Sequence, residues 1–262
     1  MSLRKYAFKM SSRALRKVAL MGVSAVALST LAVPAQAIPN FVLNGDFELV
    51  INGSGGMGEF DNLTYSTVVD WSSSGYNFIY APGTADTTGG TGTFGNVKLW
   101  GPGTGSANGL TASSPTGGNY VAADGAFQVG AISQTINGLT AGQSYILSFY
   151  WAAAQQSGFN GATTEQWQVS LGPQTQTTAV LPNVNHGFTG WMHQTFTFTA
   201  STASEALSFL AIGTPAGVPP FALLDGVSLT AATPEPGSLT LMLAGLGLVG
   251  LGVLRSKGRA RN

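Results

Sequence analysis

The stretch Ile132-Ser-Gln-Thr-Ile-Asn-Gly-Leu-Thr-Ala-Gly-Gln-Ser-Tyr-Ile-Leu-Ser-Phe-Tyr-Trp151 decides the fold of this chain. Its second half places an aromatic residue or leucine at every other position from Tyr145 to Trp151, and successive side chains of a strand point to opposite faces. In its first half, Ile132 and Ile136 share one face. The glycine-containing run between the halves is typical of a turn. The stretch therefore predicts a strand, a turn and a returning antiparallel strand.

Similar short strands follow along the chain. Trp167, Val169 and Leu171 alternate in one run, and the threonines of 195–199 alternate with two phenylalanines in another. A last run ends near Leu229. Glycine-rich turns separate the strands, and we find no amphipathic helix pattern. The predicted fold class is all-β, an antiparallel sandwich spanning residues 38–232.

One long segment interrupts this pattern. Residues 81–119 are rich in glycine, threonine, serine and proline, and only Phe94 and the run 96–100 break that composition. Connections of this length are either mobile or functional. We therefore expect a long glycine-rich loop within a single domain.

The charge of the chain is unevenly distributed. Lys98 is the only basic residue between Ile38 and Thr233, so residues 38–232 hold ten acidic residues against one basic residue, a formal charge of −9 in a chain of zero net charge. Such a surface repels nucleic-acid phosphates but suits divalent cations or neutral glycans. The chain has no cysteine, which excludes disulfides and thiol chemistry.

The N-terminal 37 residues are typical of a secretory signal peptide. Six basic residues precede an apolar run, Val18–Val33, and Ala35-Gln36-Ala37 offers a cleavage site of small residues. We therefore expect export through the general secretion machinery, with the mature chain beginning near Ile38.

The C-terminal 30 residues, 233–262, form a second separable segment. Pro234-Glu235-Pro236 predicts a stiff, extended element, because proline fixes φ and lacks a backbone donor. The uncharged run 238–254 predicts a transmembrane helix about 26 Å long. The basic residues of 255–262 would stay in the cytoplasm.

This order of elements resembles the PEP-CTERM sorting signal of Gram-negative surface and matrix proteins. The resemblance implies recognition by an exosortase, a membrane-embedded protease or transpeptidase, with cleavage near Pro234-Glu235-Pro236. The chain would then be an inner-membrane intermediate before it reaches the cell surface or extracellular matrix. An ordinary C-terminal membrane anchor is the alternative.

The central domain resembles the jelly-roll, galactose-binding-like modules, which include several carbohydrate-binding families. The motifs that carry the resemblance are Asn-Gly-Asp-Phe-Glu at 44–48, Ser-Gln-Thr-Ile-Asn-Gly-Leu at 133–139, Tyr-Ile-Leu-Ser-Phe at 145–149 and Leu-Leu-Asp-Gly-Val-Ser-Leu at 223–229. The resemblance implies a jelly-roll topology.

Asp225 is the most informative residue of the domain. It alternates with Leu223 and Leu229, so a regular strand would point its carboxylate into the core, where a carboxylate must be paired, hydrogen-bonded or metal-bound. Within the run 40–48, Phe41, Leu43 and Phe47 are expected to form an apolar face opposite Asp46 and Glu48. Ca²⁺ bound by Asp225, Glu48 and, more weakly, Asp46 is one solution. The resemblance also implies a structural calcium between first and last strands. Backbone N–H groups at a bulge near Gly226 are the alternative.

Aromatic side chains in turn-rich stretches are candidate sugar platforms. Trp71, Trp100 and Trp191 are the candidates, although packing or loop anchoring explains each of them alone. His186 and His193, the two histidines, make no standard zinc set. No Gly-x-Ser-x-Gly elbow or paired-carboxylate motif indicates catalysis, so we do not expect an enzyme.

These observations favour an exported, exosortase-sorted surface or matrix protein with a non-catalytic domain, associated with extracellular polysaccharide. The main alternative hypothesis is a carbohydrate-binding module for one defined glycan, and the third hypothesis is a hydrolase.

Overall fold

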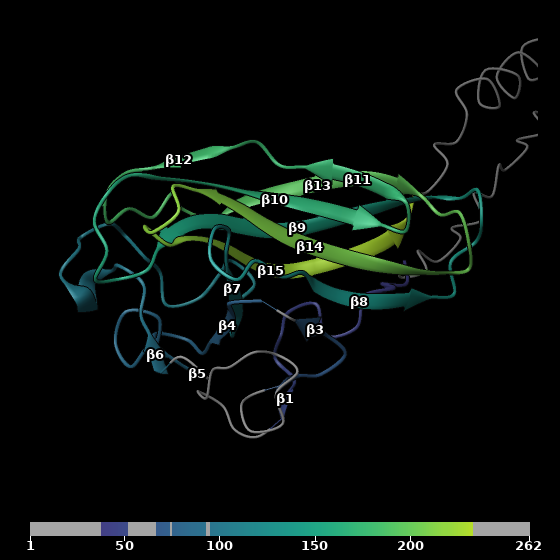
Figure 1. Cartoon of the computed structure of the whole chain (residues 1–262). Coiled ribbons are helices and arrows are strands. Elements are labelled where there is room, and N and C mark those ends of the chain that lie inside the picture. Colours follow the sequence, from purple (N-terminus) through teal and green to yellow (C-terminus); the bar gives the residue numbers. More distant parts are fainter. Residues whose placement is uncertain (1–37, 52–66, 74, 93–94, 233–262) are drawn as a thin grey trace, which may run out of the picture. The chain divides into compact units, whose positions relative to one another are not determined.

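The computed structural model describes residues 38–51, 67–73, 75–92 and 95–232 (Figure 1). The predicted signal peptide, 1–37, and the predicted tail with its transmembrane helix lie outside the described residues. The described part contains no helix long and apolar enough to span a membrane. Its helical structure is the short 3₁₀ turn η1, Pro102–Thr104.

Two antiparallel sheets form the domain, which confirms the predicted all-β sandwich (Figure 1). The first has the order β11-β10-β14-β8-β3, and β12 also pairs with β10. These strands are β3 (Ser72–Ser73), β8 (Ile132–Asn137), β10 (Thr163–Leu171), β11 (Gln174–Thr177), β12 (Leu181–Asn183) and β14 (Ser204–Thr214).

The second sheet has the order β13-β9-β15-β7-β4. Its strands are β4 (Asn77–Tyr80), β7 (Tyr120–Asp124), β9 (Ser144–Gln155), β13 (Met192–Thr199) and β15 (Pro220–Ala231). Two short pairs lie outside the main sheets: β1 (Val50–Ile51) with β2 (Thr67–Val68), and β5 (Gly90–Gly92) with β6 (Gly95–Val97).

The stretch 132–151 forms both predicted strands, but they do not pair with each other. β8 belongs to the first sheet and β9 to the second. Packed sheets lie about 10 Å apart, a span that the residues between Asn137 and Ser144 can cross. Leu139 in this connection is buried, so the turn closes one end of the core.

Aromatic rings from both sheets fill the core. Phe149 of β9 meets Phe209 of β14 edge-on, with ring centroids 5.2 Å apart. Trp167 of β10 packs against Phe209 and donates its indole N–H to the backbone oxygen of Leu223 in β15, at 3.1 Å. All three rings are fully buried, and each buried side chain of this kind contributes roughly 1.5–3 kcal/mol. The predicted core alternation of β9 and β10 is therefore confirmed.

A bulge in β15 reverses the predicted direction of Asp225. Asp225 pairs with Tyr150, whereas Ser228 pairs with Ser148, so Gly226 and Val227 together oppose one residue of β9. Gly226 supplies the positive φ (59°) that this bulge requires. Directly paired residues share a sheet face. Asp225 thus lies on the face opposite Phe149, away from the core between the sheets, and the alternation with Leu229 is broken.

The N-terminal segment also departs from its predicted pattern. Residues 40–48 form no regular strand, because Asn44 and Phe47 both adopt positive φ. Phe47 is buried, but Leu43 is 58% exposed, so the expected apolar face does not form. One isolated bridge, from Asn40 to Thr230, ties this segment to β15.

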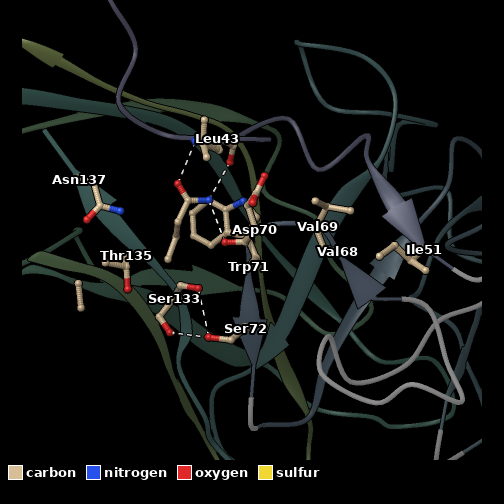
Figure 2. Close-up of a pocket in the computed structure, with 12 residues that line it drawn as sticks. Leu43, Ile51, Val68, Val69, Asp70, Trp71, Ser72, Ser133, Thr135 and Asn137 are labelled. Atoms are coloured by element: carbon tan, nitrogen blue, oxygen red, sulfur yellow. Dashed lines mark hydrogen bonds between the residues drawn. The ribbon is translucent and has the colours of Figure 1, made fainter. Parts of the chain in front are cut away.

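The side chain of Gln134 hydrogen-bonds the N-terminal segment, residues 40–48, to the first sheet. Its side-chain amide accepts a hydrogen bond from the Leu43 N–H at 2.9 Å and donates to the backbone oxygens of Leu43 and Asp70 at 2.8 and 3.0 Å. Figure 2 shows these bonds beside the Ser72–Ser133 contact. A buried glutamine thus replaces the strand pairing that residues 40–48 lack.

Replacing Gln134 with alanine should lower the free energy of unfolding by about 2–4 kcal/mol, because three hydrogen bonds are lost and their backbone partners stay partly buried. Thr135→Ala, at the next and exposed position, should change it by less than about 0.5 kcal/mol. Urea unfolding of both variants measures the difference. Equal stability of the two would show that Gln134 does not hold the segment.

Candidate functional site

The outer face of the second sheet is covered by the end of the glycine-rich loop. Asp225, Tyr150 and Tyr120 lie on this face. Ser114 and Thr116 of the loop both donate hydroxyl hydrogen bonds to Asp225 Oδ2, the Thr116 bond measuring 2.5 Å. Tyr120 is also fully buried. The sheet therefore presents covered side chains here, not an open groove.

The structure brings Glu48 close to Asp225. Glu48 Oε1 accepts the Asn119 N–H at 2.5 Å, and its carboxylate occupies the space that a Cβ would fill at Gly118. Asp225 is fully buried, and its Oδ1 has no hydrogen-bond partner among the described residues. Burial raises the pKa of Asp225 to about 6, the negative charge of Glu48 adds to the rise, and the hydroxyls and the Gly226 N–H oppose it.

Asp46 lies near the same β15 bulge, on the surface of the protein. It is exposed and lines a surface cleft of about 350 Å³ together with Gly226 and Val227. The backbone of Gly45 accepts the Val227 N–H at 2.8 Å, which fixes this approach. In the part of the chain that the structure describes, no group of three or more histidine, aspartate or glutamate side chains is arranged to hold a metal.

The three candidate tryptophans anchor different segments. Trp71 is 4% exposed and donates its indole N–H to the Asn44 oxygen at 2.9 Å. Trp100 donates to the Phe159 oxygen at 2.9 Å, and Trp191 donates to Thr111 Oγ1 at 3.0 Å. Trp100 and Trp191 are half-buried, and within the described residues no ring contact joins any two of the three indoles.

The two histidines are separated in the fold. His186 stacks on Trp100, with ring centroids 3.7 Å apart, and its Nε2 lies 2.7 Å from Asn160 Oδ1. His193 lies beside Tyr150 on β13, at a centroid distance of 5.1 Å. Each ring is thus held in contact with an aromatic neighbour.

Three buried carboxylates, those of Asp124, Glu165 and Glu205, were not singled out from the sequence. Asp124 and Glu165 are each 1% exposed, and burial raises the pKa of Asp124 to about 6 and that of Glu165 to about 8. The charge of Asp124 contributes to the rise at Glu165. The sequence did contain a signal for Glu165, because it alternates in phase with Trp167, Val169 and Leu171 on β10. Asp124, at the end of β7, had none.

Comparison with protein families identifies the C-terminal segment. Residues 232–257 match the PEP-CTERM protein-sorting motif. The chain therefore carries a PEP-CTERM sorting motif at its C-terminus, directly after the last strand of the domain. The match confirms the sorting motif predicted from the tail, and such a motif implies export and processing by an exosortase. No curated protein matches the chain in sequence.

Solved structures similar to the domain include three carbohydrate-binding modules. TmCBM61, in complex with beta-1,4-galactotriose, is 14% identical with a TM-score of 0.37, covering 74% of this chain and 99% of that one. The CBM22-1 xylan-binding domain of Paenibacillus barcinonensis Xyn10C is 12% identical (TM-score 0.36; 77% and 99% covered). A CBM4 structure is 16% identical (TM-score 0.33; 73% and 99% covered). Because the sequence identities and TM-scores are low, we assign no ligand to this chain from the three structures.

The buried carboxylates should make the protein more stable in mild acid. The folded-state pKa values of Asp124, Asp225 and Glu165 lie above their ordinary values, so the folded state binds more protons between about pH 4 and pH 8. The free energy of unfolding should therefore fall by a few kcal/mol between pH 5 and pH 8, at up to about 1.4 kcal/mol per pH unit per group.

Urea unfolding at pH 5, 6, 7 and 8 measures this slope. Glu165→Gln should flatten it most above pH 6, whereas Asp70→Asn, at an exposed carboxylate, should leave it unchanged. A free energy of unfolding that rises with pH over this range would contradict burial of the three groups.

Proposed function

We propose that the chain is an exported, exosortase-sorted protein of the cell surface or extracellular matrix whose domain is a non-catalytic jelly roll associated with extracellular polysaccharide. The observation that carries the proposal is the position of the sorting motif. β15 ends at Ala231, and the Ala232 N–H still donates to the Ser144 oxygen at 2.9 Å. Cleavage near Pro234-Glu235-Pro236 would thus leave every described strand in the processed protein.

The covered sheet face favours a scaffold over a carbohydrate-binding module. A glycan-binding groove needs exposed aromatic platforms with convergent polar groups. Here Tyr120 is buried and the hydroxyls of Ser114 and Thr116 are bonded to Asp225. Of the predicted set, Trp100 and Trp191 are half-buried, and Trp71, which is 4% exposed, lines a surface cleft of about 580 Å³ with Leu43 and Ser133.

The histidine environments support a non-catalytic role. The His186 ring is committed to Trp100 and Asn160, and His193 packs on Tyr150. A hydrolase of the Ser-His-Asp type would need a histidine base held by a carboxylate and aimed at a nucleophile. Neither ring has that arrangement among the described residues.

Processing tests the sorting proposal directly. The full chain, expressed with a cognate exosortase in a Gram-negative host, should reach the surface fraction with a C-terminus at or near residues 233–236, as measured by intact-mass spectrometry. Glu235→Ala should leave the full-length tail on the chain in the inner-membrane fraction, whereas Glu59→Ala, far from the motif in sequence, should be processed normally. Surface delivery of an uncleaved chain would contradict the proposal.

We further propose that Asp225 and Glu48 hold a structural Ca²⁺, with Asp46 contributing more weakly. The support is the buried, unpartnered Oδ1 of Asp225 beside a second carboxylate, since oxygen-rich acidic sites suit Ca²⁺. A bound cation would offset the cost of burying this charge. The hydroxyls of Ser114 and Thr116 would then orient Asp225 from its other oxygen.

Calcium should raise the melting temperature of the protein. At a Ca²⁺ concentration of about 100 times Kd the stabilisation is about 2.7 kcal/mol, or roughly 5–10 °C for a domain of this size. Glu48→Gln keeps the acceptor for Asn119 but should lose most of this response, whereas Asp70→Asn should keep it. A melting temperature that is the same in chelator and in millimolar Ca²⁺ would rule the site out.

A further inference from the structure

A small cleft lies where several connections of the sandwich meet. Its volume is about 280 Å³, and it is lined by Tyr76, Asp124, Phe127, Phe159 and Pro219, with Gln156 among its polar groups. The lining residues come from the ends of β7 and β9, from the segment before β4 and from the connection that leads into β15. Ligand pockets usually measure about 300–1,000 Å³, so this cleft suits a ligand of about monosaccharide size.

Asp124 lines this cleft and is oriented by two backbone hydrogen bonds. Its Oδ1 accepts the backbone N–H groups of Ala126 and Phe127 at 2.8 and 3.0 Å. Its Oδ2 is buried and has no hydrogen-bond partner among the described residues. Burying a carboxylate oxygen without a hydrogen-bond donor is costly. A positively charged or hydrogen-bond-donating ligand near Asp124 would offset this cost.

The walls of the cleft favour a cation over a neutral donor. Phe127 is 50% exposed and Phe159 37% exposed, and Tyr76 meets Phe127 edge-on at a centroid distance of 5.3 Å. Aromatic faces attract ammonium groups through their quadrupoles. Glu165 lies near enough to Asp124 for their charges to interact, and a bound cation would favour the ionised form of both groups. Residues 38–232 contain no arginine and one lysine, so the domain itself supplies almost no cation.

We propose that this cleft binds a small organic ammonium ion, with the negative charge of Asp124 beside the cationic nitrogen and the rings of Phe127 and Phe159 flanking its apolar part. Two sources have this chemistry: the free amine of an amino sugar, which can also donate N–H bonds, and a quaternary ammonium group, which is held by charge and ring contact alone. The proposal goes beyond the sorting function and does not depend on it.

Isothermal titration calorimetry on the full chain in a non-ionic detergent tests the site. We expect saturable binding of glucosamine, tetramethylammonium or both, at least tenfold tighter than binding of glucose or N-acetylglucosamine. Glucosamine without tetramethylammonium indicates an amino-sugar site, and the reverse indicates a quaternary ammonium site. Affinity for tetramethylammonium, whose charge does not titrate, should rise from pH 5 to pH 7 as Asp124 ionises. Burial raises the pKa of Tyr76 above its ordinary value and that of Glu165 to about 8, so both groups stay mostly neutral over this range.

Three variants separate the site from the fold. Asp124→Asn keeps an acceptor for the two backbone N–H groups but should weaken ammonium binding at least tenfold. Phe159→Ala, at a partly exposed ring, should weaken it several-fold without altering the melting temperature, and Asp70→Asn should bind like the parent. The proposal is overturned if no ammonium binds, if glucose binds as tightly as glucosamine, or if Asp124→Asn and Phe159→Ala both bind unchanged.

Discussion

The pairing of β15 with β9 and β7 is the constraint on which the rest of the structure depends. β15 is the central strand of its sheet. It receives the N-terminal segment through the bond from the Phe41 N–H to the Leu229 oxygen, and it receives the other sheet through the indole of Trp167. Its bulge at Gly226 turns Asp225 towards the loop, and its last residue borders the sorting motif. β15 thus contributes to the core and to the covered sheet face, and it directly precedes the tail in the sequence.

Buried negative charge is the second organising feature. The domain carries a formal charge of −9 and still buries Asp124, Glu165 and Asp225. Such burial is costly unless hydrogen bonds, protonation or a cation offset it. Hydroxyl groups satisfy half of Asp225, and backbone N–H groups satisfy half of Asp124. The remaining oxygens are the positions at which we propose that calcium and an ammonium ion bind.

The sequence predicted the strands well because alternation is a local property. The core positions of β9 and β10 follow from period-two patterning alone. The path of the chain after Asn137 could not be read, because a turn and a crossing between sheets have similar composition. The direction of the Asp225 side chain depends on the single extra residue of the bulge. Such a residue moves the side chains on one side of the bulge to the opposite sheet face from the one that regular alternation predicts. The cleft at Asp124 unites residues far apart in the chain, so no local pattern could mark it.

We propose that the domain is a covered scaffold and not a receptor for a neutral glycan. A glycan array probed with purified residues 38–232 tests it most directly, because the array samples neutral oligosaccharides of many linkages under one condition. We expect no saturable binding to any neutral glycan, because residues 114–119 bond to Asp225 and Glu48 on the outer face of the sheet that contains β15. Saturable binding to one neutral sugar class would contradict it and establish a carbohydrate-binding module.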